Sequence, residues 1–425
     1  MAGSRSFGVY SLDEAESYFT AALAALDSNP ECASDDQVAE FLALYVRLLN
    51  LTHRIKFVID VVGRYLTRVD RIGNDLKAVL IRTYCWALIH NGRYREAVAV
   101  QQSSETADRG TALAYRLSIS ALISPTPLHD FEIVKQDALT LLSETTDAYF
   151  QNAVRWTIGY IELTIGRINE ARNSARELMQ VGQLLNDPRS TGYGLLLLSH
   201  IAVMSGSYAE GLEYSEQSLN VAITPTDKIY ASLSKASALV ALGRNEEGMM
   251  LLEESRRRCD TDGDVFALDQ SNLLLGVCKI LQGRFADGIH VIVNGIFKTE
   301  KDGYKIMADL ERLFLADVYL QIMTGGDKKV PLPTLLRNLP ILLKVMFTAG
   351  SRIRALIRRV LENPHFDPAG FHVGHAKMIL GLLYKTRKKS AIALEYLTEA
   401  RRIFSQFGQT PILARVDTAL AELKQ

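Results

Sequence analysis

Apolar stretches of helical length are separated along this chain by a recurring polar turn. Its five copies read GRYREA, GRINEA, GSYAEG, GRNEEG and GRFADG, and they begin at Gly92, Gly166, Gly206, Gly243 and Gly283. These glycines are 74, 40, 37 and 40 residues apart, so the first interval is about two repeat units long. The pattern predicts a protein built from repeated helical units.

Three positions around each turn follow a fixed rule. Glycine comes first because a helix that ends and reverses needs a residue that tolerates positive φ just past its last turn. An acid comes fifth, where the first turn of the next helix favours negative charge. Small residues come sixth and also seven residues before the glycine: Ala97, Ala171, Gly211, Gly248 and Gly288 after the turn, and Cys85, Gly159, Ser199, Ala236 and Gly276 before it. Two small positions across a turn predict an antiparallel helix pair in close contact.

This combination resembles the tetratricopeptide repeat (TPR), in which one small residue lies in the middle of helix A and another lies early in helix B. The resemblance implies an all-α fold, a right-handed superhelical solenoid of antiparallel helix pairs. The period of 37 to 40 residues exceeds the usual TPR length of about 34 residues. Longer helices or longer loops are therefore expected.

The regularity of the repeats changes along the chain and predicts three regions. Residues 1–323 are expected to form TPR-like repeats, residues 324–373 an irregular, proline-containing helical insertion with basic character, and residues 374–425 a C-terminal repeat with a capping helix. Closely spaced prolines, the last of them Pro340, predict a short, broken element in the insertion because proline interrupts helices.

The ends of several helices are also marked in the sequence. Residues Ser11–Leu26 predict an amphipathic helix with Ser11 as its N-cap and Glu14 completing a capping box. The repeat unit hidden between the first two turn glycines is expected to turn at residues 124–130. Pro411 is expected to begin the last helix, because proline suits the first helical position.

A narrower resemblance comes from two segments. QVAEFLALYVRLLNL followed by WALIHNGRYREAVAV, and DVYLQIMTGGDKKVPLPTLLRNLPILLKVMF, are similar to the C-terminal repeat arrays of bacterial regulators. In those proteins a class III adenylate or guanylate cyclase domain is followed by a P-loop ATPase and then by the array. This sequence contains neither a GxxxxGK[ST] motif nor a catalytic cyclase region. The resemblance, which spans residues 11–423, therefore implies a regulatory or sensor arm without enzymatic activity of its own.

The TPR resemblance also implies where a ligand would lie, because TPR arrays line their concave surface with helix A. The matching residues with the strongest binding character are Arg82, Trp86, His90, Trp156, Tyr160, Tyr193, His200, Tyr230 and Gln270. Aromatic residues here would hold a protein or peptide partner by burying large areas at small entropic cost. The alternative is a tightly wound solenoid that buries Trp86 and Trp156 as core.

Charge and cysteine content narrow the choice of partner and compartment. Lys plus Arg equals Asp plus Glu at 48 each, so global charge predicts no nucleic-acid or membrane partner. Residues 328–402 nevertheless hold fifteen Lys or Arg against four Asp or Glu, so weak contact with a membrane or an acidic partner stays open beside ordinary solvated helix faces. Four cysteines without a CxxC pair, and the lack of an apolar signal segment, predict a reducing, cytoplasmic compartment.

One cluster has the residue types of a metal site. His365, Asp367, His372 and His375 lie within eleven residues, but their spacing matches no strong motif. No metal, cofactor or catalytic residue is expected, since the sequence also lacks HExxH, GxSxG and dinucleotide-binding glycine motifs. The predicted function is a non-enzymatic protein- or peptide-binding module. Two alternatives stay open: the sensor arm of a P-loop-linked transcriptional regulator, and a catalytic or metal-dependent site within residues 325–375.

Overall fold

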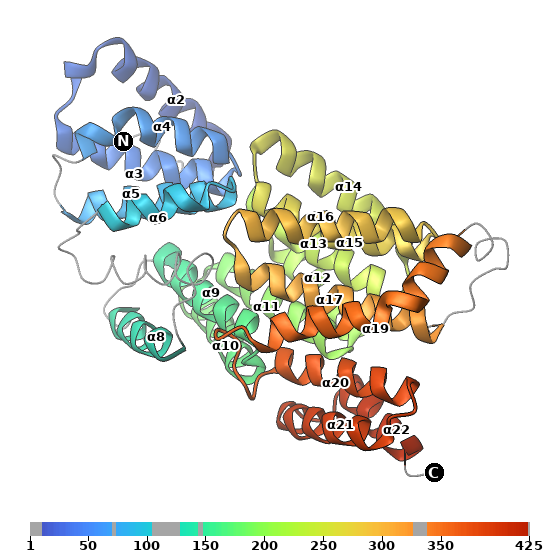
Figure 1. Cartoon of the computed structure of the whole chain (residues 1–425). Helices are drawn as coiled ribbons and strands as arrows, with labels where there is room; N and C mark the ends of the chain where they lie inside the picture. Colours follow the sequence, from blue (N-terminus) through green and yellow to red (C-terminus); the bar gives the residue numbers. More distant parts are fainter. Residues whose placement is uncertain (1–10, 70–73, 104–127, 143–147, 326–337, 424–425) are drawn as a thin grey trace.

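The computed structural model of the 425-residue chain describes residues 11–69, 74–103, 128–142, 148–325 and 338–423. In these ranges the chain forms nineteen α-helices and two short 3-10 helices, and it has no strand. Successive helices pack against each other, and Figure 1 shows them stacked in pairs along the molecule. The predicted TPR-like solenoid of helix pairs is confirmed. In the described parts of the chain, no helix combines the length and the apolar character needed to cross a membrane.

The first block of helices has a hydrophobic cluster of its own. It contains α2 (Leu12–Ser28), η1 (Pro30–Cys32), α3 (Asp35–Leu51), α4 (Ile55–Val69), α5 (Asn74–His90) and α6 (Tyr94–Ser103). The predicted capping box at Ser11 is wrong, because the Ser11 hydroxyl bonds to the Glu14 carboxylate and not to the backbone. A complete capping box forms instead at α3, between Ser34 and Gln37.

The middle of the chain is the regular array. It contains α8 (Leu128–Leu142), α9 (Ala148–Ile165), α10 (Ile168–Leu184), α11 (Pro188–Ser205), α12 (Tyr208–Val221), α13 (Pro225–Ala241), α14 (Asn245–Asp262), α15 (Val265–Leu281), α16 (Phe285–Lys301) and α17 (Lys305–Thr324). All five turn glycines lie between helices with φ from 76° to 92°, as the turn motif predicts. The predicted turn over residues 124–130 lies mostly outside the described residues.

Small residues allow the helices of each pair to approach closely. The Ser199 hydroxyl donates a 2.7 Å hydrogen bond to the Gly211 carbonyl on the facing helix. A Cβ atom added to Gly288 would lie only 2.5 Å from the carbonyl oxygen of Gly276. The two small positions predicted from the repeat therefore meet across each of these pairs, and a larger side chain would force the helices apart.

The C-terminal region contains α19 (Leu339–Leu361), α20 (Phe371–Thr386), α21 (Ser390–Phe404), η2 (Ser405–Phe407) and α22 (Pro411–Leu423). The expected broken element is wrong for residues 339–361, which form one continuous helix of 23 residues. Pro340 lies in the first turn of α19, where a helix loses no backbone hydrogen bond to proline. The predicted start of the last helix at Pro411 is confirmed.

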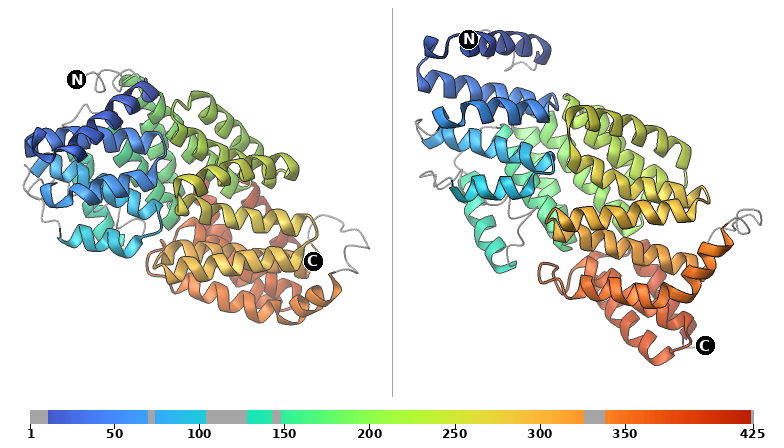
Figure 2. Two further views of the ribbon diagram at one scale, coloured as in Figure 1. Left: turned by 90° about the horizontal axis from the view of Figure 1, so that it is seen from above. Right: turned by 45° about the horizontal axis from the view of Figure 1, so that its top comes forward.

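Two long-range contacts close the solenoid on itself. The first block meets the middle array where α3 contacts α13 and α5 contacts α15, and Figure 2 shows these blue helices beside the green and yellow ones. At the other end, the segment before α20 packs on the turn between α9 and α10. There Phe371 N donates to Gly166 O at 2.8 Å, and the Arg167 guanidinium pairs with Asp367 at 2.8 Å. These contacts decide which parts of the inner face stay open.

Candidate functional site: the inner face of the A helices

All nine predicted groove residues lie on the A helices of the repeats. Arg82, Trp86 and His90 are on α5, Trp156 and Tyr160 on α9, Tyr193 and His200 on α11, Tyr230 on α13 and Gln270 on α15. The structure brings seven of them into two neighbouring groups of direct contacts. The other two residues, Arg82 on α5 and His200 on α11, are half-buried and lie outside these groups. Burial lowers the pKa of His200 to about 4.

The first group lies where α5 meets α13 and α15, with His90 buried and Trp86 and Tyr230 half-buried. The His90 ring stacks on Trp86 at 3.8 Å between centroids, and its Nδ1 lies 2.8 Å from the Tyr230 hydroxyl. That hydroxyl donates to Asp264 Oδ2 at 2.8 Å, and both Asp264 oxygens lie 3.3 Å from His90 Nδ1. We call His53, His90, Tyr230 and Asp264 together the N-terminal joint.

Asp264 is the centre of this joint. Its side chain is fully buried and caps α15 by accepting a hydrogen bond from Ala267 N at 2.9 Å. Burial opposes its ionisation, but the neighbouring His90 and His53 hold the pKa of Asp264 below its ordinary value. Burial also raises the pKa of Tyr230 far above its ordinary value, so this hydroxyl stays a donor. The joint is therefore a charge-assisted network that fixes the first block to the array.

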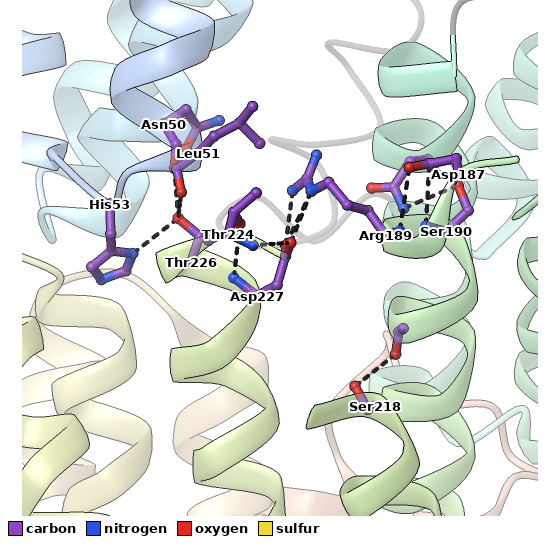
Figure 3. A network of polar contacts seen from close by, with 12 residues as sticks. Asn50, Leu51, His53, Asp187, Arg189, Ser190, Ser218, Thr224, Thr226 and Asp227 are labelled. Atoms are coloured by element: carbon purple, nitrogen blue, oxygen red, sulfur yellow. Dashed lines mark hydrogen bonds and ion pairs between the residues drawn. The ribbon is translucent and has the colours of Figure 1, made fainter. Parts of the chain in front are cut away.

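His53 is the member of the joint that sequence reasoning missed. It lies in the turn between α3 and α4 with φ of 64°, a conformation that residues other than glycine seldom adopt. Its Nδ1 lies 3.4 Å from Thr226 Oγ1, and the Thr226 hydroxyl donates to Asn50 O at 2.6 Å (Figure 3). The only sequence signal is a histidine in a glycine-free turn, which is too weak to predict a contact 211 residues away at Asp264.

The second group reaches a partly open hollow between α11, α12 and α13 through Tyr193. Tyr193 meets Trp156 edge to face, with ring centroids 4.9 Å apart, and the Arg189 guanidinium lies 5.6 Å from the Tyr193 centroid. Arg189 in turn forms a buried ion pair with Asp227 at 3.1 Å (Figure 3). The lining includes Arg189, Tyr193, Leu196, Ser218, Asp227 and Tyr230. We call this site the aromatic hollow.

The other two members of the second group meet each other across the solenoid. Gln270 Nε2 on α15 donates to the Tyr160 hydroxyl on α9 at 3.1 Å, although 110 residues separate them. Trp156 and Tyr160 are half-buried, with ring centroids 5.8 Å apart. Part of the predicted groove is thus filled by the protein's own side chains, while Trp156 and Tyr193 stay partly exposed, Tyr193 at the hollow.

Within the cluster of His365, Asp367, His372 and His375, Asp367 and His372 contact different partners on the α9–α10 side. Asp367 pairs with Arg167, and the buried His372 places its Nε2 2.9 Å from Leu163 O. Burial lowers the pKa of His372 to about 4. Within the described ranges, the only three His, Cys, Asp or Glu side chains close enough together to share a metal ion are His53, Cys259 and Asp264.

The basic region 328–402 is partly engaged in ion pairs: of its twelve Lys and Arg that the structure describes, five form one. Arg359 pairs with Glu300 at 2.6 Å, Arg401 with Asp417 at 2.6 Å, and Lys377 with Glu399. The start of α19 also exposes apolar side chains, among them Phe347 at 85% exposure. Ion pairs therefore account for less than half of the positive charge in the described part of this region.

Comparisons with known proteins find relatives only in structure. No family model matches the chain, and no curated protein matches it significantly. A Rap protein complexed with competence and sporulation factor superposes with a TM-score of 0.49 and 11% identity, covering 82% of this chain and 98% of that one. The Cut9–Hcn1 hetero-tetramer of the APC/C superposes with a TM-score of 0.49 and 14% identity, covering 100% of this chain and 75% of that one. A human IFIT1 dimer with PPP-AAAA superposes with a TM-score of 0.40 and 12% identity, covering 93% of this chain and 86% of that one. Identities this low carry no conclusion about function.

Proposed function

We propose that this chain is a non-enzymatic binding module that holds a peptide or protein segment at the aromatic hollow. The observation that supports this proposal is the half-buried Tyr193, which lines the hollow and whose ring contacts the half-buried Trp156. Rings of this kind, exposed at a concave site, are the usual anchors of protein recognition.

The walls of the hollow favour a ligand with one apolar side chain and a polar backbone. Tyr193 is held from two sides by Trp156 and Arg189, so binding would order few further side chains. The charges of Arg189 and Asp227 already satisfy each other at 3.1 Å. A charged group therefore gains little from entering, whereas an aliphatic or aromatic group can displace water from the rings.

The binding test uses peptides selected on the whole chain from a random display library. Truncating an aromatic anchor removes about 2 kcal/mol of binding free energy, or roughly 30-fold in Kd. Fluorescence anisotropy should show this loss for Tyr193→Ala and Trp156→Ala. Tyr208→Ala is the matched control, because Tyr208 begins the outer helix of the same repeat and is 39% exposed. Equal affinity in Tyr193→Ala and wild type would contradict the proposal.

The resemblance of the sequence to cyclase-linked arrays supports a more specific role as a regulatory or sensor arm in bacterial signalling. A pull-down from a cell extract, repeated with Tyr193→Ala, tests that role. Recovery of a nucleotide cyclase or P-loop ATPase by the wild type alone is the expected result. Recovery of a DNA-binding activator would instead favour the arm of a transcriptional regulator.

A further inference from the structure

Three potential metal ligands meet inside the N-terminal joint. His53 comes from the α3–α4 turn, Cys259 from α14 and Asp264 from the residue that caps α15. Their ligand atoms all lie within 4.8 Å of one another, and the residues are 0%, 1% and 0% exposed. No element of the repeat pattern requires these three residue types at one point.

The spacing of two of these atoms matches a bound ion. His53 Nε2 lies 3.3 Å from Asp264 Oδ2. Two ligands held about 2.0–2.1 Å from a tetrahedral metal ion are themselves roughly 3.3–3.4 Å apart. The nitrogen and the oxygen can therefore bind one ion without moving.

The hydrogen bonds of His53 leave its Nε2 without a partner. The single Thr226 hydroxyl proton is donated to Asn50 O, so His53 Nδ1 must be the donor in its 3.4 Å contact with Thr226 Oγ1. In the neutral ring the Nε2 lone pair then faces a carboxylate, and this buried atom forms no hydrogen bond. An ion between Nε2 and Asp264 turns that repulsion into two bonds. Metal-binding histidines also commonly donate their other ring N–H to an oxygen, as His53 does here.

We infer that His53, Cys259 and Asp264 bind a transition-metal ion, with Zn²⁺ the best fit. One thiolate, one imidazole and one carboxylate are the donors that Zn²⁺ takes in a tetrahedral site, whereas Ca²⁺ and Mg²⁺ require oxygen ligands.

The position of the site gives the ion a structural role. His53 belongs to the first block of helices, whereas Cys259 and Asp264 belong to the array. A metal bound by both parts would couple their docking to metal binding, since the complete ligand set exists only when the joint is formed. This inference is independent of ligand binding at the aromatic hollow.

The experiment uses the untagged full chain, freed of metal with a chelator and then titrated with Zn²⁺ or Co²⁺. The expected results are one metal ion per chain by mass spectrometry, a rise in melting temperature with Zn²⁺, and a thiolate-to-cobalt charge-transfer band with Co²⁺. The Co²⁺ spectrum tests Cys259 as a ligand in the wild type and needs no variant.

Variants then assign the ligands. Cys259→Ser and His53→Gln should each weaken Zn²⁺ binding by at least tenfold, a loss of about 1.4 kcal/mol. Cys278→Ser is the matched control, because Cys278 is a second free thiol that is fully buried in the array, and it should bind as the wild type does. Circular dichroism in chelator checks that each variant is folded. The inference is overturned if the wild type binds no metal, if the cobalt complex lacks a thiolate band, or if Cys259→Ser binds as tightly as Cys278→Ser.

Discussion

The N-terminal joint and the aromatic hollow both contain side chains from the inner face of the A helices, yet the joint is closed and the hollow is partly open. His90 and Tyr193 both lie on A helices and both were expected to face a ligand. His90 is 6% exposed because α13 and α15 lie opposite it, whereas Tyr193 keeps an exposed part beside the hollow. The repeat thus decides the direction in which a side chain points. Long-range closure of the solenoid decides what that side chain meets.

The largest effect is expected at Asp264. Asp264→Ala removes a helix cap and leaves the buried His90 and the Tyr230 hydroxyl without their acceptor, so the free energy of unfolding should fall by roughly 3–5 kcal/mol. Asp187→Ala is the matched control, because Asp187 caps α11 through Arg189 N and Ser190 N and should cost about 1–2 kcal/mol. Urea denaturation measures both. If the two variants lose the same free energy of unfolding, Asp264 contributes to stability only as a helix cap.

The second effect is a loss of stability in acid at the contact between α20 and α9. Burial lowers the pKa of His372 to about 4, below the value of about 6.5 in an unfolded chain. Between pH 6.5 and 4, His372 is therefore protonated in the unfolded state but not in the folded state. The free energy of unfolding falls as the pH falls through this range. The contribution of this one histidine is roughly 3 kcal/mol.

Urea denaturation at pH 7.5 and pH 4.5 checks this prediction. Because burial also lowers the pKa of His53 and His200, the wild type loses stability from several groups at once. The His372→Gln variant should lose less stability than the wild type between the two pH values, and it should retain the glutamine amide as a donor to Leu163 O. An identical acid loss in both proteins would contradict the burial of a neutral His372.

The sequence was sufficient to predict the parts of this structure that depend on neighbouring residues. Turn glycines and facing small residues act within one helix pair, so five copies of the pattern located them. Proline was harder, because its effect depends on whether it lies in the first turn, as Pro340 does, or inside the helix. Those positions cannot be distinguished until the start of the helix is known.

The sequence predicted which side of the helices carries the candidate site, but not which of its residues stay exposed. The repeat placed His90 and Tyr230 on the inner side, and the TPR resemblance implied that they would meet a partner. The structure shows that they meet each other across 140 residues. Periodicity contains no information on such contacts, since the same spacing serves an open and a closed superhelix. For the same reason, no pattern in the sequence joins His53 with Cys259.

Tyr230 provides a smaller test, because it belongs to the joint and also lines the hollow. Tyr230→Phe keeps the ring and removes the hydroxyl that donates to the Asp264 carboxylate, so stability should fall by about 1.5–3 kcal/mol. Tyr208→Phe, at an exposed ring, should change stability by less than about 0.5 kcal/mol. Thermal and urea unfolding measure the difference. If Tyr230→Phe is as stable as the wild type, the Tyr230 hydroxyl does not contribute to the stability of the joint.

The smallest effect on stability is expected at Tyr193, where the comparison between the joint and the hollow is most direct. Tyr193→Ala loses one edge-to-face contact and one contact with a guanidinium, and water can enter the partly open space, so the cost should be about 1–2 kcal/mol. Phe266→Ala, beside the joint, should cost roughly 3–5 kcal/mol. Phe266 is 6% exposed and its ring contacts both His90 and Tyr304. If unfolding in urea gives both variants the same loss, Tyr193 is core and the hollow has no free wall for a ligand.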